Sequence, residues 1–173
     1  MKVSEVKTGN PFFCQRETDL GAATELLWNG NCGFLPVVAD NGQVVGAVTD
    51  RDICIALGTK DRRAGEVTVA EIVSNRLATC TPDDDIHDAL ATMSSSKVHR
   101  LAVIGPKREL VGVLSVDDVM AKAIHTQKAD GVTTTELADS LKKIVSNQVT
   151  PPARPIEVRH PREPKAPPRR TRA

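Results

Sequence analysis

The chain has 173 residues and a formal net charge of +1, and 40% of its residues are hydrophobic whereas 2% are aromatic. This length supports one compact domain or two small intertwined ones with an aliphatic core, and so few aromatic rings disfavour nucleic-acid binding by base stacking. The sequence contains no apolar run long enough to span a bilayer and no apolar signal-peptide core, so we expect a cytoplasmic protein without membrane contact.

The first part of the chain predicts six elements. They are a helix or turn at 2–8, a strand at 12–14, a helix at 18–30, strands at 34–38 and 44–48, and a helix at 50–57. Thr18 and Asp19 are residues that cap helices, and Asn41-Gly42 is a preferred pair for a tight hairpin turn. Trp28 is expected to pack at the end of its helix rather than to stack on a ligand.

The same order of elements returns 66 residues later. Residues 3–53 match residues 69–119 without a gap, and most mismatches keep their apolar character. A chance match of this length is not expected, so the unit is duplicated, and two copies are too few for a solenoid. We therefore expect a pseudo-twofold pair in which each copy covers the apolar face of the other.

The remainder of the chain predicts one more helix and a tail. Residues 135–145 form an amphipathic pattern that could close the fold or join a dimer. Residues 151–173 contain seven prolines, seven basic and two acidic residues, and this composition predicts disorder. The predicted organisation is repeat 1 with its connector at 1–66, repeat 2 at 67–125, the C-terminal helix region at 126–150 and the tail at 151–173.

One phrase occurs in both copies and is the most informative of the sequence. A glycine lies inside an apolar strand, a hydroxyl residue follows at the expected helix start, and an aspartate lies three residues later, as in Gly46, Thr49 and Asp52. A strand glycine indicates close approach of another backbone or of a ligand. The hydroxyl and aspartate are also typical of a helix cap that binds no ligand, and this alternative remains open.

These features together resemble a known family. The tandem copy, the order of elements and the phrases GAVTDRD (46–52) and GVLSVDD (112–118) are similar to a pair of CBS domains, also called a Bateman module. The resemblance covers about residues 1–125 and includes the strands Leu35-Pro36-Val37 and Leu101-Ala102-Val103, although Ala102 replaces the family's proline. It implies an α+β fold of two tandem CBS repeats, each a small β-sheet flanked by helices.

The resemblance also implies a function. CBS pairs are non-catalytic regulatory modules that sense an adenosine-containing ligand such as AMP, ADP, ATP or S-adenosylmethionine in clefts between the repeats. Asp52 and Asp118 are expected to accept hydrogen bonds from the ribose hydroxyls. Thr49 and Ser115, beside free backbone N–H groups at a helix start, suit a phosphate oxygen.

The other expected site residues contact the base and the phosphates. Adenine is expected near Cys14 and Phe34 in one copy and near Cys80 in the other. His99 and Arg100 resemble the His-Arg pair that reaches phosphates in nucleotide-sensing members, and a guanidinium suits phosphate. We expect both to serve the cleft that bears Asp52. The equivalent residues of the first copy are uncharged, so the two clefts are expected to differ.

The four cysteines, at positions 14, 32, 54 and 80, show no metal-ligand spacing. We expect four small buried residues in a reducing compartment. In the alternative interpretation, Cys14 and Cys80 approach each other near the pseudo-twofold axis and sense the redox state.

Catalytic and metal patterns are not evident. Asp83-Asp84-Asp85 is ordinary for a helix start, although magnesium could arrive with a bound ATP. His87, His99 and His125 show no spacing of a triad or of a zinc site, so we expect no enzyme.

The expected partners are the adenosine nucleotide, a second copy in a homodimer that packs through helices, and an unidentified protein. Two alternative functions remain. The basic tail could make the protein an adaptor for nucleic acid or another polyanion, or the clefts could be vestigial and the protein a ligand-free scaffold.

Overall fold

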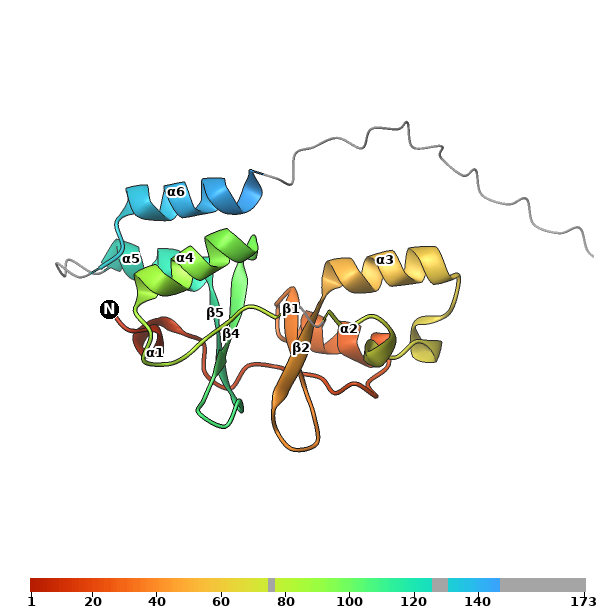
Figure 1. The fold of residues 1–173 in the computed structure, drawn as a ribbon. Coiled ribbons are helices and arrows are strands. Elements are labelled where there is room, and N and C mark those ends of the chain that lie inside the picture. Colours follow the sequence, from red (N-terminus) through yellow and green to blue (C-terminus); the bar gives the residue numbers. More distant parts are fainter. Residues whose placement is uncertain (75–76, 126–130, 147–173) are drawn as a thin grey trace, which may run out of the picture.

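The computed structural model describes residues 1–74, 77–125 and 131–146. Figure 1 shows two lobes side by side, each with a small sheet and flanking helices, as expected for an α+β fold. The first repeat contains α2 (Leu20–Asn29), β1 (Phe34–Val38), β2 (Val44–Thr49), α3 (Asp50–Lys60) and the short helices η1 (Ala64–Glu66) and η2 (Val69–Glu71). The second contains β3 (Thr79–Cys80), α4 (Ile86–Ser96), β4 (Arg100–Ile104), β5 (Leu110–Ser115) and α5 (Val116–His125), and the chain also forms α1 (Val3–Val6) and α6 (Thr134–Val145).

Local sequence explains where most helices begin. The carboxylate of Asp19 accepts a hydrogen bond from the Ala22 N–H at the start of α2, and Asp85 accepts one from the His87 N–H at the start of α4. Helix α3 continues three residues beyond the predicted range. The predicted strand at 12–14 is reduced to one bridge, in which Cys14 pairs in parallel with Val37.

The two sheets have equivalent registers. β1 and β2 are antiparallel with Phe34 opposite Thr49, and β4 and β5 are antiparallel with Arg100 opposite Ser115. β3 joins β4 in parallel, as the Cys14 bridge joins β1. The first residue of β1 and of β4 therefore lies opposite the residue that starts the next helix, which brings both strand entries beside a helix N-terminus.

The segments that precede each repeat cross to the other repeat. Val3 and Val6 of α1 are buried in the core of the second repeat, whereas Val67 and Val69 are buried in the core of the first. Figure 1 shows α1 and the N-terminus beside the second lobe. The predicted boundary between residues 66 and 67 follows the sequence repeat, but the packing exchanges these two segments.

A glycine in each sheet admits the crossing segment. An added Cβ at Gly46 would lie 2.5 Å from Val73 and 2.9 Å from the Ser74 carbonyl oxygen, and one at Gly112 would lie 2.7 Å from the Thr8 carbonyl oxygen. The close approach predicted from the strand glycines is therefore that of another backbone.

Isolated bridges reveal the pseudo-twofold relation. Thr8 pairs with Val113 and Ala47 with Ser74, which is the same pairing displaced by the repeat length. Gln43 pairs with Glu109, its own equivalent in the other repeat. The pseudo-twofold axis therefore passes between the two hairpins.

Helix α6 covers only the second repeat. It packs against α4 and α5, and its Leu137 and Ile144 are buried in that core. The equivalent face of α2 and α3 has no such cover among the described residues, and Trp28 is 83% exposed there. The expectation that Trp28 packs at its helix end was wrong.

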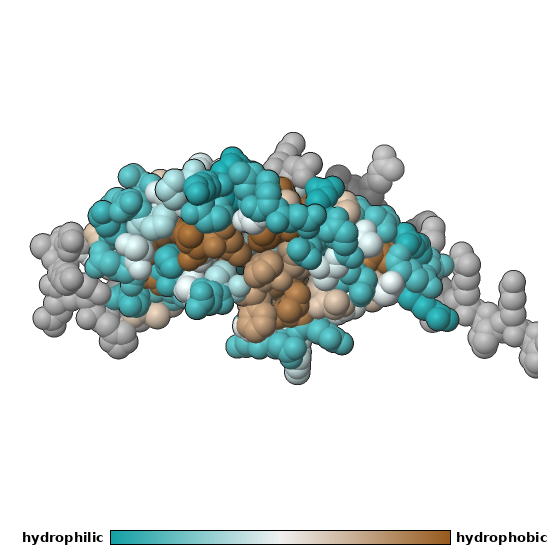
Figure 2. Space-filling model, turned by 90° about the horizontal axis from the view of Figure 1, so that it is seen from below, coloured by the Kyte–Doolittle hydropathy of each residue, from teal (hydrophilic) through white to brown (hydrophobic). Residues whose placement is uncertain are grey.

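Within the three described ranges, no helix is both long and apolar enough to cross a membrane. Figure 2 shows hydrophobic residues gathered near the middle of the face seen from below. Phe12 and Phe13 are among the exposed large hydrophobic residues. The predicted tail at 151–173 lies outside the described residues.

Candidate functional site: two clefts between the repeats

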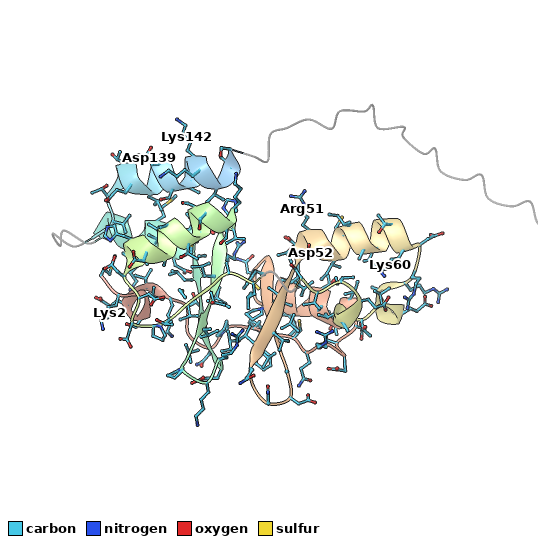
Figure 3. All side chains as sticks on the ribbon, viewed as in Figure 1. Lys2, Arg51, Asp52, Lys60, Asp139 and Lys142 are labelled. Carbon is cyan, nitrogen blue, oxygen red and sulfur yellow. The ribbon has the colours of Figure 1, made fainter. Side chains whose placement is uncertain are left out.

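The first cleft, which we call the Asp52 cleft, has a volume of about 540 Å³ and is lined by both repeats. Thr49 and Asp52 contribute from the start of α3, and His99 and Arg100 contribute from the entry to β4. Figure 3 shows Asp52 at the junction of the two lobes. The structure thus places His99 and Arg100 in the same cleft as Asp52, across the pseudo-twofold axis.

The second cleft, which we call the Asp118 cleft, uses the equivalent positions of the other repeat and has a volume of about 320 Å³. Ser115 and Asp118 lie at the start of α5, and Thr8 and Phe12 of the N-terminal crossing segment form another part of the lining. Phe34, at the start of β1, lines both clefts.

Both hydroxyl–aspartate pairs form helix caps. The Thr49 hydroxyl donates to Asp52 Oδ2 over 2.6 Å, the Thr49 N–H donates to the same oxygen over 2.9 Å, and the Asp52 N–H donates to Thr49 Oγ1 over 3.2 Å. Ser115 and Asp118 repeat these bonds at 2.5, 2.8 and 3.0 Å. A carboxylate has about four acceptor positions, so the cap and a ribose contact are compatible.

The charges of the two clefts differ. The Asp52 cleft is lined by three basic residues, Arg51, Lys97 and Arg100, and by two acidic ones. The described lining of the Asp118 cleft has Arg100 together with Asp117 and Asp118. The Asp52 cleft is therefore the more favourable one for an anion.

Cys14 and Cys80 lie behind the clefts rather than in their lining. Both thiols are buried, Cys14 in the core of the first repeat and Cys80 in that of the second. Burial raises the pKa of Cys14 to about 11 and that of Cys80 to about 12, so both thiols stay protonated at neutral pH. This favours their interpretation as small core residues over a redox pair. The prediction of burial was wrong for Cys54, which is exposed, and Cys32 is only partly buried.

Sequence reasoning missed several lining residues, among them two pairs on the segments that cross between the repeats. Phe12 and Ala78 occupy equivalent positions two residues before the cysteines, and Thr8 and Ser74 occupy equivalent positions on the crossing segments. The repeat offset relates the members of each pair. The missing information was that each crossing segment runs beside the sheet of the other repeat.

The acidic run Asp83-Asp84-Asp85 and His87 have structural partners. Lys2 Nζ lies 2.8 Å from Asp83, the Thr81 N–H and hydroxyl donate to Asp84, and Asp85 caps α4. His87 Nδ1 lies 2.7 Å from Asp85 Oδ1. The described residues contain no group of three or more His, Cys, Asp or Glu side chains that could hold a metal.

Two α+β repeats that exchange their leading segments and enclose two pseudo-equivalent clefts define a class of paired-repeat modules. Residues 3–59 and 69–125 each match the family model described as CBS domain. The chain therefore belongs to the CBS domain family, and it carries two such domains in tandem.

Curated relatives include a CBS domain-containing protein, an uncharacterized protein and an enzyme. The chain is 30% identical over 112 residues to the CBS domain-containing protein YhcV of Bacillus subtilis, covering 65% of this chain and 78% of that protein. It is 24% identical to the uncharacterized protein MK0525 of Methanopyrus kandleri, covering 67% of this chain and 57% of that protein. It is 25% identical to a homoserine O-acetyltransferase of Methanosalsum zhilinae, covering 68% of this chain and 23% of the enzyme.

Solved structures share the fold. The CBS domain pair of protein MJ0100, in complex with 5′-methylthioadenosine and S-adenosyl-L-methionine, has a TM-score of 0.65 and 23% identity and covers 74% of this chain and 98% of that one. CBSX2 in complex with AMP has a TM-score of 0.64 and 24% identity, covering 73% and 98%. The CBS domain protein TA0289 of Thermoplasma acidophilum has a TM-score of 0.68 and 21% identity, covering 83% and 75%.

Proposed function

We propose that the chain is a regulatory module that senses an adenosine nucleotide in the Asp52 cleft. The observation that carries this proposal is the joint lining of one cleft by Thr49 and Asp52 from the first repeat and by His99 and Arg100 from the second. The adenosine compounds bound by the related CBS pairs of MJ0100 and CBSX2 support the ligand class.

Each residue has a role that follows from its chemistry. Asp52 accepts hydrogen bonds from the ribose hydroxyls with the oxygen capacity that the cap leaves. The N-terminus of α3 attracts phosphate oxygens, and the Thr49 hydroxyl can donate to one of them if it rotates away from Asp52 Oδ2. Lys97, His99 and Arg100 supply the donors from the second repeat, and Arg100 offers a planar fork for a phosphate. In this scheme, magnesium enters only with a bound ATP.

Regulation follows from the shared lining. A ligand that contacts both repeats stabilises the arrangement in which both sets of contacts form, so binding shifts the relative packing of the repeats. We propose that a partner protein reads this change. The absence of catalysis and the cytoplasmic location remain predictions from the sequence, and polyanion binding by the tail remains an alternative.

A thermal-shift panel with AMP, ADP, ATP, S-adenosylmethionine, NADH and guanine nucleotides tests the ligand class. A ligand at 100 times its Kd stabilises the fold by about 2.7 kcal/mol. We expect an adenosine-specific shift that is lost in Asp52→Asn and kept in a surface control, Arg63→Gln. No shift with any compound would contradict the proposal and favour the ligand-free scaffold, for which the caps alone explain Thr49 and Asp52.

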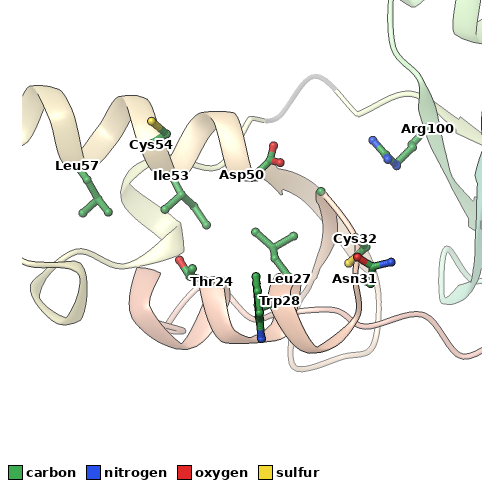
Figure 4. A pocket seen from close by; sticks show the side chains of 11 residues that line it. Thr24, Leu27, Trp28, Asn31, Cys32, Asp50, Ile53, Cys54, Leu57 and Arg100 are labelled. Carbon is green, nitrogen blue, oxygen red and sulfur yellow. The ribbon is translucent and has the colours of Figure 1, made fainter.

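We propose further that a homodimer forms through the uncovered face of α2 and α3. A groove of about 630 Å³ runs between these helices, with Leu27 and Trp28 from α2 and Ile53 and Leu57 from α3 (Figure 4). Trp28 is equivalent to Ser94, whose hydroxyl donates to the Ser140 carbonyl of α6 in the covered repeat. Because the equivalent position is covered, an exposed indole here indicates a contact surface.

Light scattering after size-exclusion chromatography tests the dimer. Trp28→Ser introduces the residue type that the second repeat has at Ser94. This substitution should shift the equilibrium from dimer to monomer. Phe13→Ser changes another exposed aromatic residue outside the groove and should leave the dimer intact. A monomeric wild type, or a dimer that survives Trp28→Ser, would contradict this assignment.

A further inference from the structure

We propose that Arg100 is shared by the two clefts, so that a phosphate-bearing ligand in the Asp52 cleft weakens the binding of a second anion in the Asp118 cleft. This inference rests on the nucleotide site proposed above and adds a coupling between the clefts. It follows from the position of one side chain and from the charges around it.

Arg100 lies on the wall between the clefts. It is the first residue of β4, opposite Ser115 of β5, and it lines both clefts and the end of the groove between α2 and α3. Figure 4 shows its side chain extending from β4 toward the first repeat, on the side where Asp50 lies. Its guanidinium can therefore face either cleft by a change of side-chain conformation.

The contact that Arg100 makes is weak. Its Nη2 lies 3.9 Å from Asp117 Oδ2, and the Asp117 side chain is 84% exposed while that of Arg100 is 34% exposed. Exposed ion pairs at this distance contribute little to stability because water screens them. A bound phosphate, which can accept two parallel hydrogen bonds from one guanidinium, is the stronger partner.

The two clefts depend on Arg100 to different extents because their other charges differ. In the Asp52 cleft, Arg51 and Lys97 remain as cations whether or not Arg100 takes part. In the described lining of the Asp118 cleft, Arg100 is the single cation, and Asp117 and Asp118 are both acidic. When a phosphate in the Asp52 cleft engages Arg100, the Asp118 cleft is left with two carboxylates and repels an anion.

The residue equivalent to Arg100 in the first repeat does not supply a second positive charge. Phe34 occupies the equivalent position and lines both clefts, but it carries no charge. The pair of clefts therefore has one movable cation for two sites. It accepts one phosphate-bearing ligand in the Asp52 cleft and an uncharged adenosine compound in the Asp118 cleft.

Calorimetric titration of the full chain with AMP and adenosine tests the coupling. In wild type, we expect a first AMP molecule to bind at least ten times more tightly than a second one. Binding of the second AMP molecule should vanish in Asp118→Asn. With the first site loaded with AMP, adenosine should bind the second cleft at least ten times more tightly than AMP does. Asn keeps the acceptor oxygen of the cap, so this variant is expected to fold.

Two further variants separate the causes. Arg100→Gln should weaken the binding of the first AMP. It should also make the preference of the second cleft for adenosine over AMP independent of the first cleft, because Asp117 and Asp118 then lack their cation whether or not that cleft is loaded. Arg63→Gln removes the same charge outside both clefts and should leave the preference dependent on loading of the first cleft. Two AMP molecules that bind with equal affinity, both weakened equally by Arg100→Gln, would overturn the sharing while the nucleotide site stands. If neither AMP nor adenosine binds, the proposed function itself fails, and this inference fails with it.

Discussion

The Asp52 cleft and the Asp118 cleft occupy equivalent places in a duplicated scaffold, yet one has a volume of about 540 Å³ and the other about 320 Å³. Lys97 of the first corresponds to Asn31 of the second, and Ala78 corresponds to Phe12. The larger cleft is also the more basic one. After duplication, the two sites thus diverged through side chains on the strand entries and crossing segments.

The features that are the same in both repeats are those that fix the backbone conformation. Both helices begin with the same hydroxyl–aspartate cap, and both sheets accept a crossing segment against a glycine. These features stabilise the fold whether or not a ligand binds. The comparison therefore separates two roles of these aspartates. Asp52 and Asp118 both cap a helix, and we assign the contact with the nucleotide to Asp52.

Replacing the two aspartates separates these contributions and should have the largest effect. Asp52→Ala removes a charged hydrogen-bond contact worth about 1.5–3 kcal/mol, so AMP affinity should fall by tenfold or more. Asp118→Ala should leave the first AMP event nearly unchanged. Each variant also loses its cap, which should lower the unfolding free energy by about 1 kcal/mol.

Calorimetry measures the affinities, and urea denaturation measures the stabilities. Asp52→Asn and Asp118→Asn serve as controls because an amide oxygen still accepts the cap bond. If Asp118→Ala weakened the first AMP as much as Asp52→Ala did, the assignment of the nucleotide to the Asp52 cleft would be wrong.

Substitutions of the two strand glycines test whether the crossing segments are held against the sheets beside the clefts. In Gly46→Ala, the new Cβ would meet Val73 at 2.5 Å and the Ser74 carbonyl oxygen at 2.9 Å, so the crossing segment beside the Asp52 cleft must shift. Overpacking of this kind costs about 1–3 kcal/mol of stability. Gly112→Ala should have a similar cost and should disturb the Asp118 cleft instead.

Gly58→Ala provides the matched control in urea denaturation. Gly58 lies inside α3, and an added Cβ there meets nothing within 4 Å. Alanine should therefore stabilise the helix by about 0.5–1 kcal/mol. Equal effects of Gly46→Ala and Gly58→Ala would show that the crossing segment does not constrain Gly46.

These residues also show how far the sequence alone leads. The ungapped offset of 66 residues predicted the duplication, the element order and the two caps, because all of these are local patterns that recur. It related Gly46 to Gly112 and predicted a close approach at both. It did not reveal which backbone approaches, because the periodicity of a segment indicates that it is buried but not in which core.

Trp28 and Phe12 illustrate a second limit. Hydrophobic patterning predicts burial, yet both side chains are exposed, because their surroundings depend on segments distant in the chain. Helix α6 covers one helix pair and leaves the other open, and nothing within residues 135–145 specifies which pair it covers. The presence of Phe12 in the lining of the Asp118 cleft has the same origin, since the loop that carries it crosses between the repeats.

Phe12→Ala tests whether this side chain accounts for the difference in volume. The substitution gives the Asp118 cleft the residue that the Asp52 cleft has at Ala78, and it should open the smaller cleft. We expect tighter adenosine binding there by severalfold in calorimetry. Because Phe12 is half exposed, the loss of stability should stay below about 1.5 kcal/mol. Weaker adenosine binding would show instead that Phe12 contacts the base.

The helix caps at Asp19 and Asp85 extend the comparison of the two repeats beyond the clefts. Replacing Asp85 is expected to have the smallest effect on the free energy of unfolding. Asp85 accepts bonds from the backbone N–H and the ring of His87, and these bonds lower the pKa of its carboxyl from 3.8 to about 2. A depressed pKa in the folded state stabilises the fold above pH 4, and this stabilisation is lost as the pH falls toward 2. Solvent screening limits it to about 0.2–1 kcal/mol.

Urea denaturation between pH 5 and pH 2.5 should show wild type more stable than Asp85→Asn at the upper end, with the difference shrinking at the lower end. The backbone bond is the largest cause of the shift, so His87→Gln should keep more than half of the pH-dependent difference. A difference that vanished entirely in His87→Gln would mean that the ring, rather than the N-terminus of α4, holds the Asp85 carboxylate. The ring bond would then be the feature that distinguishes Asp85 from Asp19, whose carboxylate accepts the Ala22 N–H.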